Sequence, residues 1–145
     1  MASRIYLLGG WQTDFAANWT REGRTIFEMM AEATLGAMDA AKVEAADIEV
    51  AHIGNFAGEL YCEQGHLGGM FTAIDPHFVG LPTMRHEAAC ASGSMAALSA
   101  MADIEAGRYD LACVVGVEMM RSVPGDTATR YLGTAAWTGR EAETA

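Results

Sequence analysis

The residue with the clearest chemical potential in this sequence is Cys90. It lies in residues 85–95, which read RHEAACASGSM, between a predicted strand at 81–87 and a predicted helix at 91–106 that Gly107 ends. The amino-terminal end of a helix favours a thiolate over a thiol, and small residues around Cys90 let a substrate or another backbone come close. A single cysteine can also be a small buried side chain, so position alone leaves a nucleophile and a core residue equally open.

The other two cysteines, Cys62 and Cys113, form no recognisable site with Cys90. The three are widely spaced and no C-x-x-C motif is present, which disfavours a disulfide framework and a zinc site. Cys113 lies inside the apolar run 111–117, so we predict that it belongs to the core. Cys62 lies in a glycine-rich segment and is left undecided, with a core position favoured.

The histidines predict no metal site either, because their spacing does not place two of them on one helical face. They are His52, His66, His77 and His86. His86 lies four residues before Cys90, but this separation across a strand-to-helix junction does not establish a Cys–His pair. We therefore expect no bound metal.

The elements that must position Cys90 alternate between strands and helices. Strands are predicted at 5–8, 48–53, 81–87 and 111–117, and helices after Thr25, at 61–73 and at 91–106. Thr25 and Glu28 form a capping box at the start of the first helix. The continuous apolar run 111–117 is typical of a central parallel strand buried on both faces, and the helix at 91–106 is predicted to be buried between two layers, with Leu98 and Met101 among its contacts. The order predicts an α/β fold with helices covering a parallel sheet.

Composition excludes several classes of function. The chain has 145 residues and a net charge of −10, with 19 acidic against 9 basic residues, which argues against sequence-independent binding to nucleic acid. No apolar run approaches the length of a membrane span, and the first residues lack the apolar core of a signal peptide. We therefore predict a cytoplasmic protein that binds neither membranes nor nucleic acid.

Three motifs resemble the amino-terminal half of the thiolase family when they are taken in order. They are EAACASGS at 87–94, AGRYD at 106–110 and GVEMM at 116–120. The similarity is nearest the archaeal and bacterial thiolases related to the sterol-carrier-protein type, and it runs from Ile5 to about Ala136. It implies a thiolase-like α/β fold with a parallel or mixed sheet, incomplete because a fifth strand of that half would follow. Residues 1–120 would form the core and residues 121–145 the start of a loop subdomain.

The resemblance also implies a function. Cys90 would be the catalytic nucleophile, attacking the acyl group of a coenzyme A thioester and holding it as an acyl-enzyme thioester while 3-ketoacyl-coenzyme A is made or cleaved, as in lipid metabolism. The backbone N–H of Cys90 would contribute to an oxyanion hole. Coenzyme A thioesters would be substrates, and no tightly bound cofactor or metal is expected.

The same family implies partners. The histidine and second-cysteine motifs of the carboxyl-terminal half are absent from these 145 residues, so we expect that half on a second chain or a cleaved fragment. The strand Thr83–Glu87 would pair with its copy in a homodimer or tetramer. Two alternatives stay open at this stage: a relative of ketoacyl or hydroxymethylglutaryl-coenzyme A synthases, and a catalytically idle structural half-subunit.

Overall fold

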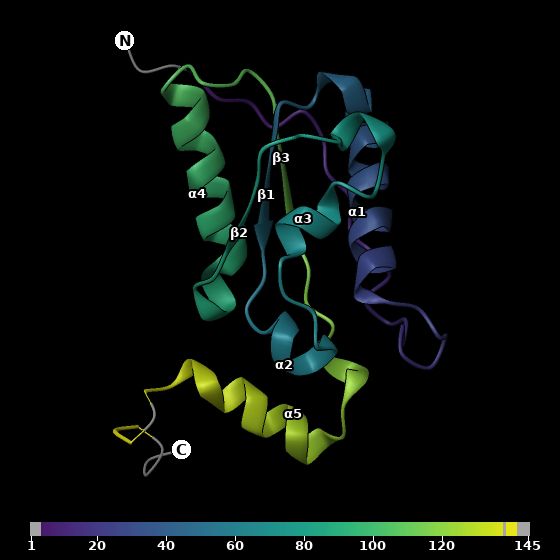
Figure 1. The fold of residues 1–145 in the computed structure, drawn as a ribbon, viewed down its shortest axis with the longest axis vertical. Helices are drawn as coiled ribbons and strands as arrows, with labels where there is room; N and C mark the ends of the chain where they lie inside the picture. The colour runs from purple at the N-terminus through teal and green to yellow at the C-terminus, as the bar shows by residue number, and fades with distance from the viewer. Residues whose placement is uncertain (1–3, 138, 142–145) are drawn as a thin grey trace.

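A parallel three-stranded sheet forms the centre of the molecule (Figure 1). The computed structural model describes residues 4–137 and 139–141. The strands are β1 (Val50–Gly54), β2 (Thr83–His86) and β3 (Ala112–Gly116), in the order β2-β1-β3. In this register Gly54 lies opposite His86 on one side and Gly116 on the other, so the carboxyl ends of all three strands meet at one edge. The prediction of an α/β fold with a parallel sheet is confirmed.

Helices cover both faces of this sheet. Helix α4 (Ser92–Glu105) lies on one face, and α1 (Ile26–Ala41) lies on the other with the short helix α3 (Leu67–Phe71) (Figure 1). Helices α2 (Gly58–Cys62) and α5 (Gly125–Leu132) lie beyond the carboxyl ends of the strands. The loops at that edge therefore lie between the layers that cover the sheet and the helices beyond the strand ends.

The start of α1 follows from its sequence. The Thr25 hydroxyl accepts a bond from the backbone N–H of Glu28 at 3.3 Å, and the Glu28 carboxylate accepts one from the backbone N–H of Thr25 at 2.7 Å. This reciprocal pair satisfies two N–H groups that the helix itself leaves without partners. The predicted capping box is confirmed, and α1 packs Met30 into the core that it shares with β1 and α3.

Two predicted elements are wrong. Residues 5–8 form no strand: they run as irregular chain, and the Leu7 side chain is 99% exposed. The predicted helix at 61–73 is two short helices, because Glu63 and His66 adopt left-handed backbone conformations (φ 54° and 52°) that a continuous right-handed helix excludes.

Burial also differs from expectation on two elements. Val114 in β3 is 42% exposed, so this strand is not buried on both faces as predicted. On α4 the small residues Ala96 and Ala100 face the sheet, whereas Leu98 and Met101 are 55% and 41% exposed. Within the described residues nothing covers the outer face of α4, which is why it is not buried between two layers.

The segment after residue 120 is attached to the fold through α2. The Tyr61 hydroxyl donates to the Ala128 carbonyl at 2.9 Å, and the rings of Tyr61 and Tyr131 meet edge to face. The proposed boundary between a core at 1–120 and a loop subdomain at 121–145 stays a prediction. None of the helices in the described ranges has the length and apolarity needed to span a bilayer.

Candidate active site around Cys90

Cys90 is exposed on a 3₁₀ turn, Ala89–Ala91, that leads directly into α4. The predicted strand-to-helix junction is therefore confirmed. Ala89 has φ 48°, a left-handed conformation that costs a residue with a β-carbon about 1–2 kcal/mol. Unfavourable backbone geometry of this kind is concentrated at functional sites, where surrounding bonds maintain it.

Two side chains hold this turn in place. The Glu87 carboxylate accepts a bond from the Ala89 N–H at 2.6 Å. The hydroxyl of the buried Ser92 accepts from the Ala88 N–H at 2.9 Å and donates to the Ala89 carbonyl at 2.7 Å. These bonds fix the peptide groups on both sides of Ala89. They therefore also fix the orientation of the backbone at Cys90.

Close packing places the turn against the end of β1. A β-carbon built on Gly54 would lie 2.6 Å from Cα of Gly93 and 2.8 Å from the carbonyl carbon of Ser92. Only glycine allows the backbone of α4 to approach the strand this closely. Cys90 therefore lies at the carboxyl edge of the parallel sheet, where ligand sites of α/β folds are generally found.

A cavity of about 570 Å³ opens in front of Cys90. Its walls come from the irregular segment around Trp11 and Phe15, from Gly54–Phe56 at the end of β1, and from Gly116–Arg121 at the end of β3. These segments are far apart in sequence and meet because the strand ends meet. The arrangement gives an exposed thiol a concave surface large enough for a substrate group.

Glu118 and Asn55 organise the wall opposite the turn. The Glu118 carboxylate accepts bonds from the Phe56 N–H at 2.7 Å and from the Ala57 N–H at 3.4 Å. Burial raises the pKa of Glu118, and these N–H groups oppose the rise. The buried Asn55 side chain donates to the Val117 carbonyl at 2.8 Å, so two side chains, those of Glu118 and Asn55, join the segments after β1 and β3.

Arg85 holds the same wall from the β2 side. It donates to the Phe56 carbonyl at 2.9 Å and pairs with Glu59, and this bond lowers the pKa of Glu59. The Phe56 peptide is therefore held at its N–H by Glu118 and at its carbonyl by Arg85. Sequence analysis singled out neither Arg85 nor Asn55 for this site, and Glu118 only as part of a motif.

Comparison with known proteins places these features in a family. Residues 5–143 match the model of the thiolase amino-terminal domain. The chain belongs to the thiolase family. The predicted membership and the thiolase-like fold of an amino-terminal half are both confirmed.

Curated relatives give the same assignment. The chain is 34% identical over 123 residues to an acetyl-CoA acetyltransferase of Methanothermobacter thermautotrophicus, which covers 85% of this chain and 31% of the relative. It is 32% identical over 127 residues to an acetyl-CoA acetyltransferase of Methanocaldococcus jannaschii, covering 86% and 31%. A third relative, non-specific lipid-transfer protein-like 2 of Caenorhabditis elegans, is 29% identical over 117 residues, covering 81% and 27%. The chain thus spans about a third of the length of these relatives.

The remaining cysteines of this thiolase domain lie outside the cavity in front of Cys90. Burial raises the pKa of Cys113 to about 11, so this thiol stays protonated at neutral pH. Cys62 is half-buried, with its Sγ 3.7 Å from the Met119 carbonyl oxygen, and burial raises its pKa as well. Within the described ranges, Cys90 is the thiol that is both exposed and open to a cavity.

Among the described residues, no histidine lines the cavity in front of Cys90. His86 bonds to His52 at 2.9 Å instead of forming the Cys–His pair that the sequence left open, and His77 contacts Asp75. No cluster of three or more potential metal ligands occurs among the residues that the structure describes.

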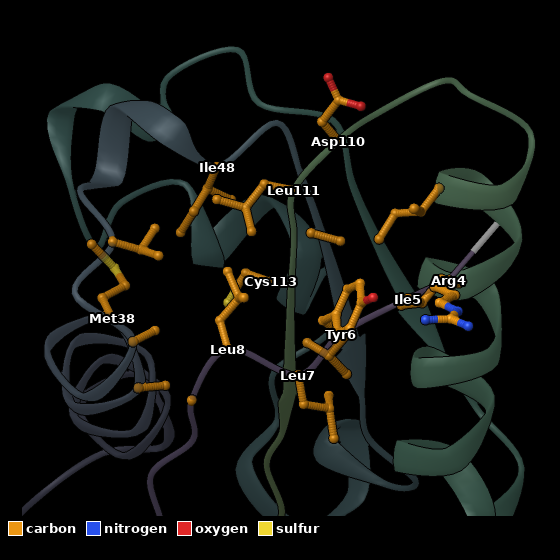
Figure 2. A pocket seen from close by; sticks show the side chains of 17 residues that line it. Arg4, Ile5, Tyr6, Leu7, Leu8, Met38, Ile48, Asp110, Leu111 and Cys113 are labelled. Carbon is orange, nitrogen blue, oxygen red and sulfur yellow. The ribbon is translucent and has the colours of Figure 1, made fainter.

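A second cavity, of about 320 Å³, lies at the free edge of β3 (Figure 2). Residues 4–9 and residues 110–114 line it, together with Met38 and Ile48. Cys113 and Leu8 are among the lining side chains in Figure 2. Apolar side chains line both sides of this space, which lies between the edge strand β3 and the amino-terminal segment.

Proposed function

We propose that this chain is the amino-terminal part of a thiolase-type acyltransferase and supplies its nucleophile, Cys90. The observation that carries the proposal is the exposed Cys90 on a strained turn at the start of α4, facing the larger cavity. The acetyl-CoA acetyltransferase names of two relatives support a coenzyme A thioester as the substrate. No tightly bound cofactor is required for this chemistry.

The first half-reaction follows from this geometry. The Cys90 thiolate adds to the carbonyl carbon of the acyl thioester, and the carbonyl electron pair moves to oxygen. Backbone N–H groups at the start of α4, including that of Cys90, stabilise this oxyanion. When the carbonyl re-forms, the bond to the sulfur of coenzyme A breaks, coenzyme A leaves as a thiolate that takes a proton from solvent, and the acyl group remains on Cys90.

We also propose that a second polypeptide, or the far side of a proteolytic cut, completes the enzyme. Two unoccupied surfaces support this: the cavity between residues 4–9 and the free edge of β3, and the apolar outer face of α4 formed by Met95, Leu98 and Met101. A further strand fits the first surface, since it would pair with β3, and a helical layer fits the second.

A homodimer or tetramer through Thr83–Glu87 belongs to the same proposal. β2 is an edge strand of the described sheet, and Met84 on it is 48% exposed. We place the assembled enzyme in the cytoplasm, acting on 3-ketoacyl-coenzyme A in either direction.

The test uses the purified protein with any chain that accompanies it. After incubation with acetyl-coenzyme A, peptide mass spectrometry is expected to find one acetyl group on Cys90, and Cys90→Ser is expected to abolish it. Cys113→Ser is the matched control and is expected to retain acylation. Native mass spectrometry of the same sample is expected to reveal the second chain. An active 15.4 kDa monomer would refute the proposed partner, and an unmodified Cys90 would instead support the catalytically idle half-subunit.

A further inference from the structure

The cavity in front of Cys90 crosses the carboxyl edge of the sheet. Cys90 lines it from the α4 side, and Met29 and Ala33 line it from α1, which covers the other face of the sheet (Figure 1). The strand ends Gly54 and Gly116 line it as well, and neither has a side chain to fill the space between the two layers. The cavity therefore connects the thiol with one face of α1.

Large apolar side chains line the α1 end of this cavity and are left uncovered. Trp11 is 58% exposed and Phe15 is 88% exposed, and both lie in the irregular segment that precedes α1. Met29 and Ala33 are four positions apart, so they lie on the same face of the helix. An apolar surface that lines a cavity is one that an apolar ligand can cover.

Gly36 positions the indole of Trp11. A β-carbon built on Gly36 would lie 2.4 Å from Cγ of Trp11 and 2.7 Å from Cδ1 and Cδ2, so the indole lies directly against the backbone of α1. Glycine is unfavourable inside a helix, and here its missing β-carbon is what allows this contact. Gly36 follows Ala33 by three positions and continues the same face. The ring is thus held against the helix while its remaining surface is exposed at the cavity.

The size of the cavity exceeds what a two-carbon acyl group needs. Its volume is about 570 Å³, whereas an apolar cavity of about 150 Å³ is enough to hold benzene. The thiol and the exposed indole line the same cavity, so an alkyl chain attached to Cys90 can reach apolar surface without leaving it. The covalent attachment point identifies the occupant of this surface as the chain that Cys90 carries.

We propose that Trp11 is a specificity-determining residue, and that its indole contacts the alkyl chain of an acyl group on Cys90. The site then takes unbranched acyl chains longer than acetyl. Gly36 is a positioning residue, since it acts only through Trp11. This inference rests on the proposed function, because the acyl group is the one that Cys90 would receive from coenzyme A.

The first experiment measures chain-length preference without acyl transfer. Cys90 is alkylated with iodoacetamide or N-butyl iodoacetamide, in the purified protein with any accompanying chain, and sites are mapped by mass spectrometry. In both reagents the sulfur displaces iodide from the same CH₂ group, and rates are normalised to those of N-acetylcysteine. Full burial of one methylene improves binding about fourfold, so partial burial of the butyl chain is expected to favour N-butyl iodoacetamide several-fold.

Trp11→Ala is expected to abolish this preference while leaving the rate with iodoacetamide within about twofold, because the smaller reagent does not reach the indole. Trp137→Ala is the matched control: Trp137 is 63% exposed and does not line the cavity, so the preference is expected to stay. A wild-type protein with no preference for the butyl reagent, or a Trp11→Ala variant that keeps it, would overturn the inference.

Gly36→Ala tests how the indole is positioned. The added methyl group displaces the ring and is expected to reduce the preference for the butyl reagent, but to have no further effect in the Trp11→Ala background. A reduction of equal size in both backgrounds would remove Gly36 as the residue that positions Trp11.

The second experiment compares hexanoyl-coenzyme A with acetyl-coenzyme A as acyl donors to Cys90. Wild type is expected to be acylated at lower concentrations of the hexanoyl thioester, and Trp11→Ala is expected to lose this difference. Acylation by both donors without dependence on Trp11 would overturn the inference and leave the proposed function. A butyl preference that depends on Trp11, with no acylation by either donor, would overturn only the proposed function.

Discussion

The contact between Gly54 and the first turn of α4 predicts a large effect from a single methyl group. In Gly54→Ala the new β-carbon would lie 2.6–2.8 Å from backbone atoms of Gly93 and Ser92, whereas ordinary contacts begin at 3.4 Å. Either the strand end or the helix must retreat by several tenths of an ångström. The atoms in the way are backbone, so no side-chain rotation relieves the contact. Overpacking of this kind costs about 1–3 kcal/mol of unfolding free energy.

The matched control is Gly116→Ala. Gly116 lies opposite Gly54 in the neighbouring strand, and a β-carbon there meets nothing within 4 Å. Alanine restricts the unfolded chain more than glycine does, so this variant is expected to be neutral or more stable by up to about 1 kcal/mol. Both variants replace glycine by alanine, and they differ only in the atoms that the added methyl group contacts.

Guanidinium denaturation of both variants measures the stability difference, and the iodoacetamide rate at Cys90 measures the displacement of the turn. Gly54→Ala is expected to lower both quantities, because α4 carries the turn that presents Cys90. Equal midpoints and equal alkylation rates for the two variants would refute the argument that this close approach positions the thiol.

Two further substitutions test the walls of the site. Ala89→Gly removes the penalty of the left-handed conformation and is expected to stabilise the fold by about 0.5–1 kcal/mol in the same denaturation assay, whereas Ala91→Gly, at an ordinary φ of −94°, is expected to destabilise it by a similar amount. Asn55→Ala leaves the Val117 carbonyl without its side-chain donor and is expected to cost about 1–3 kcal/mol, and an unchanged midpoint would remove Asn55 as a link between the two loops.

Local patterns predicted the features whose causes are local. The capping box at Thr25 and the junction at Cys90 depend on neighbours within a few residues, and both occur where the sequence placed them. The Glu118–Phe56 bond joins residues 62 apart, and the His52–His86 bond joins residues 34 apart. The periodicity of a local segment cannot predict such long-range contacts. They depend on the order of the strands in the sheet, which the whole chain determines.

The wrong predictions share a different cause. Residues 5–8 have the composition of a strand, but a strand exists only when a neighbour supplies hydrogen bonds, and in the described structure none does. The small residues of the helix at 91–106 predict burial between two layers, with Leu98 and Met101 as contacts, and burial likewise needs a covering layer. Composition indicates which secondary structure or burial a segment could adopt. It does not indicate whether the neighbouring strand or covering layer that this requires is present.

The free edge of β3 has a consequence for how such a chain is handled during synthesis. In the described sheet β3 pairs with a strand on one side only, so the backbone groups on its outer side, beside a cavity lined with apolar side chains, can template an extended segment of suitable sequence. If the proposed second polypeptide supplies the partner strand, that strand must arrive before strands of neighbouring copies do. The timing of assembly, rather than the stability of the finished sheet, would then limit the yield of native protein, and dilution or co-synthesis with the partner would raise it.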